Sequence, residues 1–164
     1  MEKIRLRACA LIIQKGAILL IEYANDDDDG VHYNLPAGGV EPGETLTEAA
    51  IREAREEACA DIEVGRVAFV YEYQPVKSDF IYGDTHSVGI TFECKLKAGS
   101  RPQLPKKPDP NQIGVKWIPV SDLEGIRLYP EINQDIIDYY HGRAYRNYVE
   151  EQQIQQSKKA AGPT

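Results

Sequence analysis

Hydrophobic residues fall in short runs that turn signals separate, a pattern typical of a sheet with buried strands. The segments Arg5–Gln14 and Ala17–Tyr23 are rich in Ile and Leu, and Lys15-Gly16 between them is a turn signal. These segments predict a β-hairpin whose strands are largely buried. Further strands are expected at His32–Leu35, Glu63–Tyr73, His86–Leu96 and Val115–Val120.

Helical periodicity occupies two other regions. The strongest signal runs from Thr45 to Ala58, a segment rich in Ala, Glu and Arg with Thr45 or Thr47 as the N-cap. Residues 130–148 carry apolar side chains at helical spacing and predict a second helix. Strands before and after a central helix, with another helix near the end, predict an α/β fold: a mixed sheet covered by helices on its two faces.

The remaining segments predict loops around one domain. Asn25–Gly30 is a run of Asp residues ending in Gly, and without EF-hand spacing it predicts a solvated loop. Lys97–Gln112 holds four prolines and is also expected to be a loop. A chain of 164 residues is the size of one compact domain, which we assign to residues 1–148, and the polar residues 149–164 are expected to form a flexible tail.

Charge and cysteine content narrow the classes of partner. The formal net charge of −7 disfavours a broad basic surface for duplex nucleic acid or an anionic membrane. A phosphate-bearing small ligand stays compatible with this charge, because a bound cation reverses the local field. Three widely spaced cysteines, Cys9, Cys59 and Cys94, form no CxxC pattern and indicate a reducing compartment without structural zinc. No apolar run approaches the ~18 residues of a membrane-spanning helix, so we expect a cytoplasmic protein.

The helix predicted at 45–58 has an acidic face beside an apolar one. On a helical wheel, Glu56 and Glu57 lie within about 60° of Glu53, so three carboxylates share one arc. The small apolar residues of the helix form an adjacent stripe that can press close to a sheet. Like charges at this spacing destabilise a helix unless something compensates, and either a bound cation or ion pairs with Arg52 and Arg55 would do so.

Spacing distinguishes these two interpretations. Gly38 is followed after five residues by Glu44, after seven more by Arg52-Glu53, and after two more by Glu56-Glu57. This segment, Gly38 to Ala60, resembles the Nudix box. The lead-in Leu35-Pro36-Ala37-Gly38-Gly39 and the later segment Trp117–Leu123 also resemble that family, so the resemblance covers roughly residues 5–140.

The resemblance implies a Nudix-type α/β/α sandwich and a set of roles. Glu53, Glu56 and Glu57, joined by the Gly38 carbonyl, would bind Mg²⁺, or Mn²⁺ as a substitute, and carry catalysis. Glu44 and Arg52 would support the site by bridging loop and helix. The implied function is hydrolysis of the phosphoanhydride of a nucleoside diphosphate linked to another moiety, as in a nucleoside triphosphate or ADP-ribose. The alternative is a regulatory module that binds nucleotides without chemistry.

The chain departs from the family pattern at the end of the helix. Cys59 replaces the usual Gly, and a non-glycine residue in the left-handed region costs about 1 kcal/mol, so we expect the helix to end without a left-handed residue. The segment before the strand that contains Trp117 also offers no obvious carboxylate for the role of general base, and Asp109 is the nearest one. Glu93 is the other candidate, and Glu56 or Glu57 could activate water within the metal cluster.

Candidate substrate-binding residues lie on the predicted strands. Arg5 and Arg7 alternate on the first strand and His86 begins a later one, so these three residues are candidates for phosphate contacts, with surface or structural roles as the alternative. Three tyrosines, Tyr71, Tyr73 and Tyr82, are candidates for stacking on a base or are half-buried sheet residues. The sequence leaves open whether the chain is a monomer or a homodimer.

Overall fold

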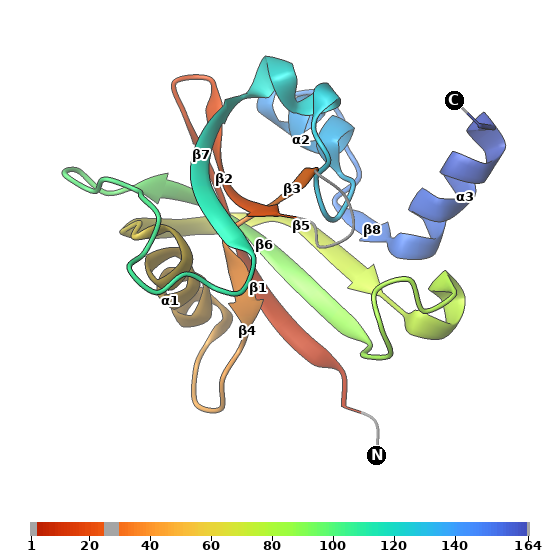
Figure 1. The fold of residues 1–164 in the computed structure, drawn as a ribbon, viewed down its shortest axis with the longest axis horizontal. Coiled ribbons are helices and arrows are strands. Elements are labelled where there is room, and N and C mark those ends of the chain that lie inside the picture. The colour runs from red at the N-terminus through yellow and green to blue at the C-terminus, as the bar shows by residue number, and fades with distance from the viewer. Residues whose placement is uncertain (1–2, 25–29, 164) are drawn as a thin grey trace.

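The computed structural model describes residues 3–24 and 30–163, and the strands in these ranges form one mixed sheet (Figure 1). The strands follow the order β3-β2-β1-β6-β5-β8, while β4 pairs with β1 and β7 pairs with β2. The pairs β1–β6 and β5–β8 are parallel. The bounds are β1 (Arg5–Gln14), β2 (Ala17–Ala24), β3 (Val31–Asn34), β4 (Ala37–Gly39), β5 (Ile62–Tyr73), β6 (Ser87–Leu96), β7 (Gln112–Pro119) and β8 (Tyr148–Glu150).

The predicted N-terminal hairpin is confirmed. Strands β1 and β2 are antiparallel and joined by Lys15 and Gly16, which both have positive φ, 52° and 77°. Two successive residues in this region make the type I′ turn whose twist matches that of the flanking strands. The Asp-rich segment 25–30, predicted to be a loop, lies outside the described residues except for Gly30. The proline-rich loop runs up to Gln112, where β7 begins.

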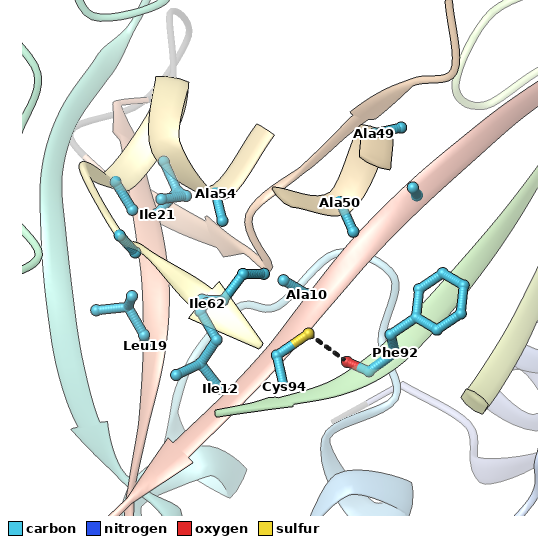
Figure 2. Close-up of a cluster of buried hydrophobic side chains, with 13 residues drawn as sticks. Ala10, Ile12, Leu19, Ile21, Ala49, Ala50, Ala54, Ile62, Phe92 and Cys94 are labelled. Atoms are coloured by element: carbon cyan, nitrogen blue, oxygen red, sulfur yellow. Dashed lines mark hydrogen bonds between the residues drawn. The ribbon is translucent and has the colours of Figure 1, made fainter. Parts of the chain in front are cut away.

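Helix α1 (Leu46–Ala58) covers one face of the sheet. Its N-cap is Thr45, as predicted, and a capping box joins Thr45 and Glu48 reciprocally. Ala50 and Ala54 of α1 face the central strands near Ala10 of β1 in Figure 2. Because these side chains are small, the helix packs close to the sheet, and the predicted apolar stripe is confirmed.

The end of α1 contradicts the expectation from the sequence. Cys59 lies in the left-handed region at φ 52° and ψ 31°, so the prediction that the helix would end without a left-handed residue was wrong. The amides of Cys59 and Ala60 donate to the carbonyls of Arg55 and Ala54 over 3.0 and 3.1 Å. These bonds satisfy carbonyls that the helix leaves without partners and offset the strain of a non-glycine residue.

The opposite face of the sheet carries the second helical layer. The 3₁₀ helix η2 (Val120–Gly125) and α2 (Asn133–Tyr140) cover a second apolar cluster, in which Leu123, Ile136 and Phe69 of β5 are buried. With α1 on one face and α2 on the other, the predicted α/β/α sandwich is confirmed. Within the described residues, no helix is both long and apolar enough to cross a membrane.

The C-terminal segment differs from the predicted helix and flexible tail. The helix expected within 130–148 is confined to α2, and the chain then forms β8 and α3 (Glu151–Ala161). Helix α3 packs against β5 and the 3₁₀ helix η1 (Pro75–Ser78). Val149 and Ile154 are buried, which gives this mostly polar segment an apolar anchor that its composition conceals.

Candidate functional site

Gly38 brings the loop before α1 into contact with the helix. A Cβ at this position would lie 2.1 Å from the Glu53 carboxylate, so any side chain there would displace that carboxylate. Strand β4 holds Gly38 opposite Ala8 of β1. The glycine that opens the box and the first glutamate of its acidic face are therefore neighbours, as the resemblance to the Nudix box implied.

Arg52 ties this loop to the helix. Its Nε and Nη2 donate to the two carboxylate oxygens of Glu44 at 2.5 and 2.9 Å, and Nη2 also donates to the Gly39 carbonyl at 2.9 Å. Its Nη1 donates to Glu53 at 2.7 Å. The hydrogen bonds from Arg52 lower the pKa of Glu44 to about 2. This bidentate pair is the predicted bridge between loop and helix, and it fixes the Glu53 carboxylate as well.

Glu57 is a buried carboxylate, only 4% exposed. Its Oε1 accepts a hydrogen bond from the Ala37 amide at 2.8 Å, and its Oε2 accepts one from the Tyr23 hydroxyl at 2.9 Å. Burial raises the pKa of Glu57 to about 7 against the effect of these two bonds, and the charges of Glu53 and Asp109 raise it further. A cation beside Glu57 would relieve this destabilisation of the ionised form.

The donor set suits a divalent cation. Carboxylates of Glu53, Glu56 and Glu57 with the Gly38 carbonyl are hard oxygen ligands, which Mg²⁺ and Mn²⁺ prefer. Glu53 lies against Gly38, and Glu57 is buried within electrostatic reach of Glu53. Glu56 is 58% exposed and pairs with Arg52 at 3.3 Å. Among residues 3–24 and 30–163, no three His, Cys, Asp or Glu side chains converge as a preformed ligand group. Glu53 and Glu56 would therefore exchange an arginine contact for a metal.

A cavity of about 590 Å³ lies over the face of the central strands that α2 also covers. Side chains alternate between the two faces of a strand, so every second residue of three adjacent strands forms its floor. Gly89 pairs with Arg7 on one side and with Tyr71 on the other. No side chain therefore separates these two residues. The floor consists of Arg5, Arg7 and Cys9 of β1, Ser87, Gly89 and Thr91 of β6, and Tyr71 and Tyr73 of β5.

An aromatic wall borders this floor. Tyr82 packs edge-to-face on Tyr129 with ring centroids 5.7 Å apart, and Tyr129 packs in the same manner on His32 at 5.2 Å. Ala37, whose amide binds Glu57, also lines the cavity. The cavity therefore adjoins the acidic helix at Ala37, and its lining combines two arginines with several tyrosines.

Predicted site residues fall into two groups. In the first group, Arg52 contacts Glu44, Glu53 and Glu56, and Gly38 lies against Glu53. Glu57 contacts Ala37, which lines the cavity together with Arg5 and Arg7. Glu93 stays apart: it pairs with Arg66 at 2.9 Å and accepts a hydrogen bond from Tyr139 of α2. His86 bonds to Glu72 at 2.7 Å, and of its neighbourhood Thr85 and Ser87 line the cavity instead.

Some residues of the site carry no signal in the sequence. Tyr23 ends a buried strand and reads as a sheet residue, yet its hydroxyl holds Glu57. Gln112 looks like the end of a loop, and its side-chain amide donates to the Glu57 carbonyl at 2.7 Å. Tyr129 and His32 complete the aromatic wall from loop and edge positions. These contacts depend on tertiary packing, which residue spacing alone does not encode.

The fold and the acidic helix define a class of small α/β/α proteins built around a loop–helix–loop site. A family model described as NUDIX domain matches residues 3–140, and the chain belongs to the Nudix hydrolase family. The solved structure of a Nudix hydrolase from Nitrosomonas europaea superimposes with a TM-score of 0.67 at 21% identity, covering 92% of this chain and 80% of that one.

Two curated relatives are similar in sequence. The 8-oxo-dGDP phosphatase NUDT18 of Homo sapiens is 30% identical over 126 residues, which cover 74% of this chain. The nucleoside triphosphatase NudI of Escherichia coli is 38% identical over 99 residues, which cover 52% of this chain. The chain spans 35% of the length of the human relative and 64% of the bacterial one.

Proposed function

We propose that this chain is a divalent-metal-dependent pyrophosphohydrolase that cleaves the phosphoanhydride of a nucleoside diphosphate linked to another moiety. The observation that carries the proposal is the position of Glu57. This buried carboxylate is bonded to Ala37, and Ala37 lines a cavity whose floor holds Arg5 and Arg7. A carboxylate that can bind a cation and arginines that can bind phosphates thus adjoin the same cavity.

Each residue has a role that follows from its contacts. Glu53, Glu56, Glu57 and the Gly38 carbonyl would hold Mg²⁺. The bound ion supplies charge neutralisation on the phosphates and lowers the pKa of water. Arg5 and Arg7 bind the phosphate oxygens, because guanidinium groups pair with them in bidentate geometry.

The remaining residues keep the site in place. Arg52 and Glu44 hold the loop on the helix, and this contact also orients Glu53. Since Glu93 is engaged by Arg66 and Tyr139, we assign proton abstraction from water to a carboxylate of the box, Glu56 or Glu57.

The substrate class is proposed from the same features and from the relatives. The human and bacterial relatives are named for a nucleoside diphosphate and for nucleoside triphosphates. A cavity lined by both aromatic rings and two arginines fits a ligand that carries a base and phosphates. Nucleoside triphosphates, nucleoside diphosphates and ADP-ribose are therefore the compounds to test.

A regulatory module that binds nucleotides without chemistry is the second candidate. The arrangement of Arg52 favours it, because this arginine already neutralises Glu53 and Glu56, the carboxylates that a metal would need. Binding of nucleotide without turnover would be its signature.

The test is release of phosphate or nucleoside monophosphate from a panel of these compounds, with Mg²⁺ and with EDTA. We expect turnover of at least one compound in Mg²⁺ alone. Glu57→Gln should lower it by more than the 10- to 100-fold typical of groups that only support metal ligands. Glu124→Gln removes one exposed carboxylate of η2 and serves as the matched control, which should keep its activity. Binding without turnover of any compound would favour the regulatory module.

A further inference from the structure

Glu151 is a buried carboxylate that the proposed chemistry does not use. It is the first residue of α3, is 1% exposed, and lies beyond residues 3–140 that match the family. Its Oε2 accepts a hydrogen bond from the Tyr71 hydroxyl at 2.6 Å, and its Oε1 accepts one from the Gln155 side-chain Nε2 at 2.8 Å. Burying a carboxylate costs free energy, so the position of Glu151 beside a tyrosine of the cavity points to a function.

The contact with Glu151 fixes the polarity of Tyr71. A phenol has one proton to donate and lone pairs that accept. Burial, followed by the hydrogen bond to Glu151, raises the pKa of Tyr71 far above its usual range, so the proton stays in the bond to the carboxylate. Tyr71 lines the cavity, and its oxygen can therefore serve a ligand there only as an acceptor.

The cavity lining contains a second acceptor besides Tyr71. Asn34 also lines the cavity, and its buried Oδ1 accepts no hydrogen bond within the described structure. Tyr73, by contrast, is satisfied: its hydroxyl donates to the Gly83 carbonyl at 2.7 Å and accepts from the Tyr82 amide at 3.1 Å. The lining thus holds two oxygens that accept no hydrogen bond within the described structure, those of the Tyr71 hydroxyl and the Asn34 side chain.

We propose that Glu151 is a positioning residue that holds Tyr71 as a hydrogen-bond acceptor, so that the aromatic end of the cavity selects a nucleobase carrying an exocyclic amino group. The base goes to this end because Arg7, across the gap at Gly89 from Tyr71, draws the phosphates to the other side. The inference rests on the proposed nucleotide substrate and adds which nucleotides are preferred.

The test is calorimetric binding of two uncleavable probes in Mg²⁺: the α,β-methylene analogue of ADP and its purine riboside counterpart, which lacks the amino group. Wild-type protein should prefer the ADP analogue by about three- to tenfold, the strength of one hydrogen bond. Tyr71→Phe and Glu151→Ala should abolish the preference, and Glu151→Gln, whose amide oxygen still accepts from Tyr71, should retain it.

Tyr33→Phe is the matched control, because the Tyr33 hydroxyl donates to Glu22 at the same 2.6 Å and Tyr33 does not line the cavity. Its preference should equal that of the wild type. If Glu151→Ala fails to fold, Tyr71→Phe decides the question.

A preference that survives Tyr71→Phe, or one that Tyr33→Phe abolishes too, would overturn the proposal, as would failure of the wild type to bind either probe. Because neither probe is cleaved at the bridged position, the outcome does not depend on turnover. A chain that binds and discriminates without hydrolysing any nucleotide would refute the proposed function and keep this inference.

Discussion

Cys59 ends α1 with positive φ, in a conformation that glycine adopts without strain. Cys59→Gly should therefore raise the free energy of unfolding by about 1 kcal/mol. Urea denaturation of the two proteins measures this difference. Cys59→Ala is the matched control, since it removes the thiol and keeps the Cβ, and it should give no comparable gain. Equal gains from both variants would mean that the thiol, and not the backbone, is the source of strain.

Glu57 makes the stability of the metal-free protein depend on pH. Its pKa is raised from 4.5 to about 7, so between these values the folded state binds more protons than the unfolded state. Stability therefore falls as pH rises through this window, by on the order of 3 kcal/mol. Urea midpoints in EDTA from pH 4.5 to 8 measure the effect, and Glu57→Gln should flatten that part of the profile. Parallel profiles for the two proteins would contradict it.

Residue spacing predicted the contacts within the box but not the contacts that other elements make with it. The contacts of Arg52 with Glu44 and Glu53 lie within one loop and one helix, where spacing fixes geometry. Tyr23 reaches Glu57 from a strand 34 residues away, and such a contact follows from the sheet order instead. Glu93 was a candidate for the general base as a carboxylate on a predicted strand, but its partners Arg66 and Tyr139 come from other elements, and those contacts were unknown before the fold.

The elements were predictable wherever periodicity was strong. Strands β1, β2, β5 and β6 and helix α1 appear within one residue of their predicted ends because their apolar residues are dense and clearly spaced. Helix α3 was missed because its anchor consists of few residues, chiefly Ile154, among polar ones. Its stability comes from packing on β5 and η1, which composition does not reveal.

Gly89, which leaves no side chain between Arg7 and Tyr71, provides a test of where the ligand lies on the sheet. A Cβ there would meet the Cys9 Sγ at 3.6 Å, an ordinary contact, so the fold should accept a larger side chain. Gly89→Val should place its methyl groups between Arg7 and Tyr71 and weaken binding of the α,β-methylene analogue of ADP by about tenfold or more. The thermal midpoint should not fall, because a β-branched residue suits a strand.

Gly125→Ala, outside the cavity and with open space around its Cβ, is the control for the Gly89 variant and should bind as the wild type does. Unchanged binding by a folded Gly89→Val protein would show that the ligand does not cross this part of the floor.

At the scale of the whole molecule, the C-terminal segment is part of the fold. Removing residues 147–164 would expose the edge of β5 and delete the buried Val149 and Ile154, which should lower the free energy of unfolding by about 3 kcal/mol or more. Removing only residues 158–164, of which 158–163 are exposed, should change it by no more than about 0.5 kcal/mol. Urea denaturation and light scattering compare the two proteins, and equal stabilities would contradict the role assigned to β8 and α3.

The sandwich itself could be predicted because the order of strands and helices restricts the layers to few arrangements. The cavity could not, since its floor combines alternate residues of β1, β6 and β5, and only the parallel pairing of β1 with β6 brings Arg7 and Gly89 side by side. Nothing local in the sequence specifies that pairing.

The parallel pairing of β5 with β8 also bears on how the chain folds. Tyr71 and Glu151, which this pairing brings together, are 80 residues apart. Contacts of such separation close a long loop and form slowly. While the protein is being synthesised, one edge of β5 thus stays unpaired until β8 forms. An unpaired edge is prone to associate with another unfinished chain. The contact of Tyr71 with Glu151 is therefore among the last to be assembled, and nascent chains that lack it should be the ones that require chaperones.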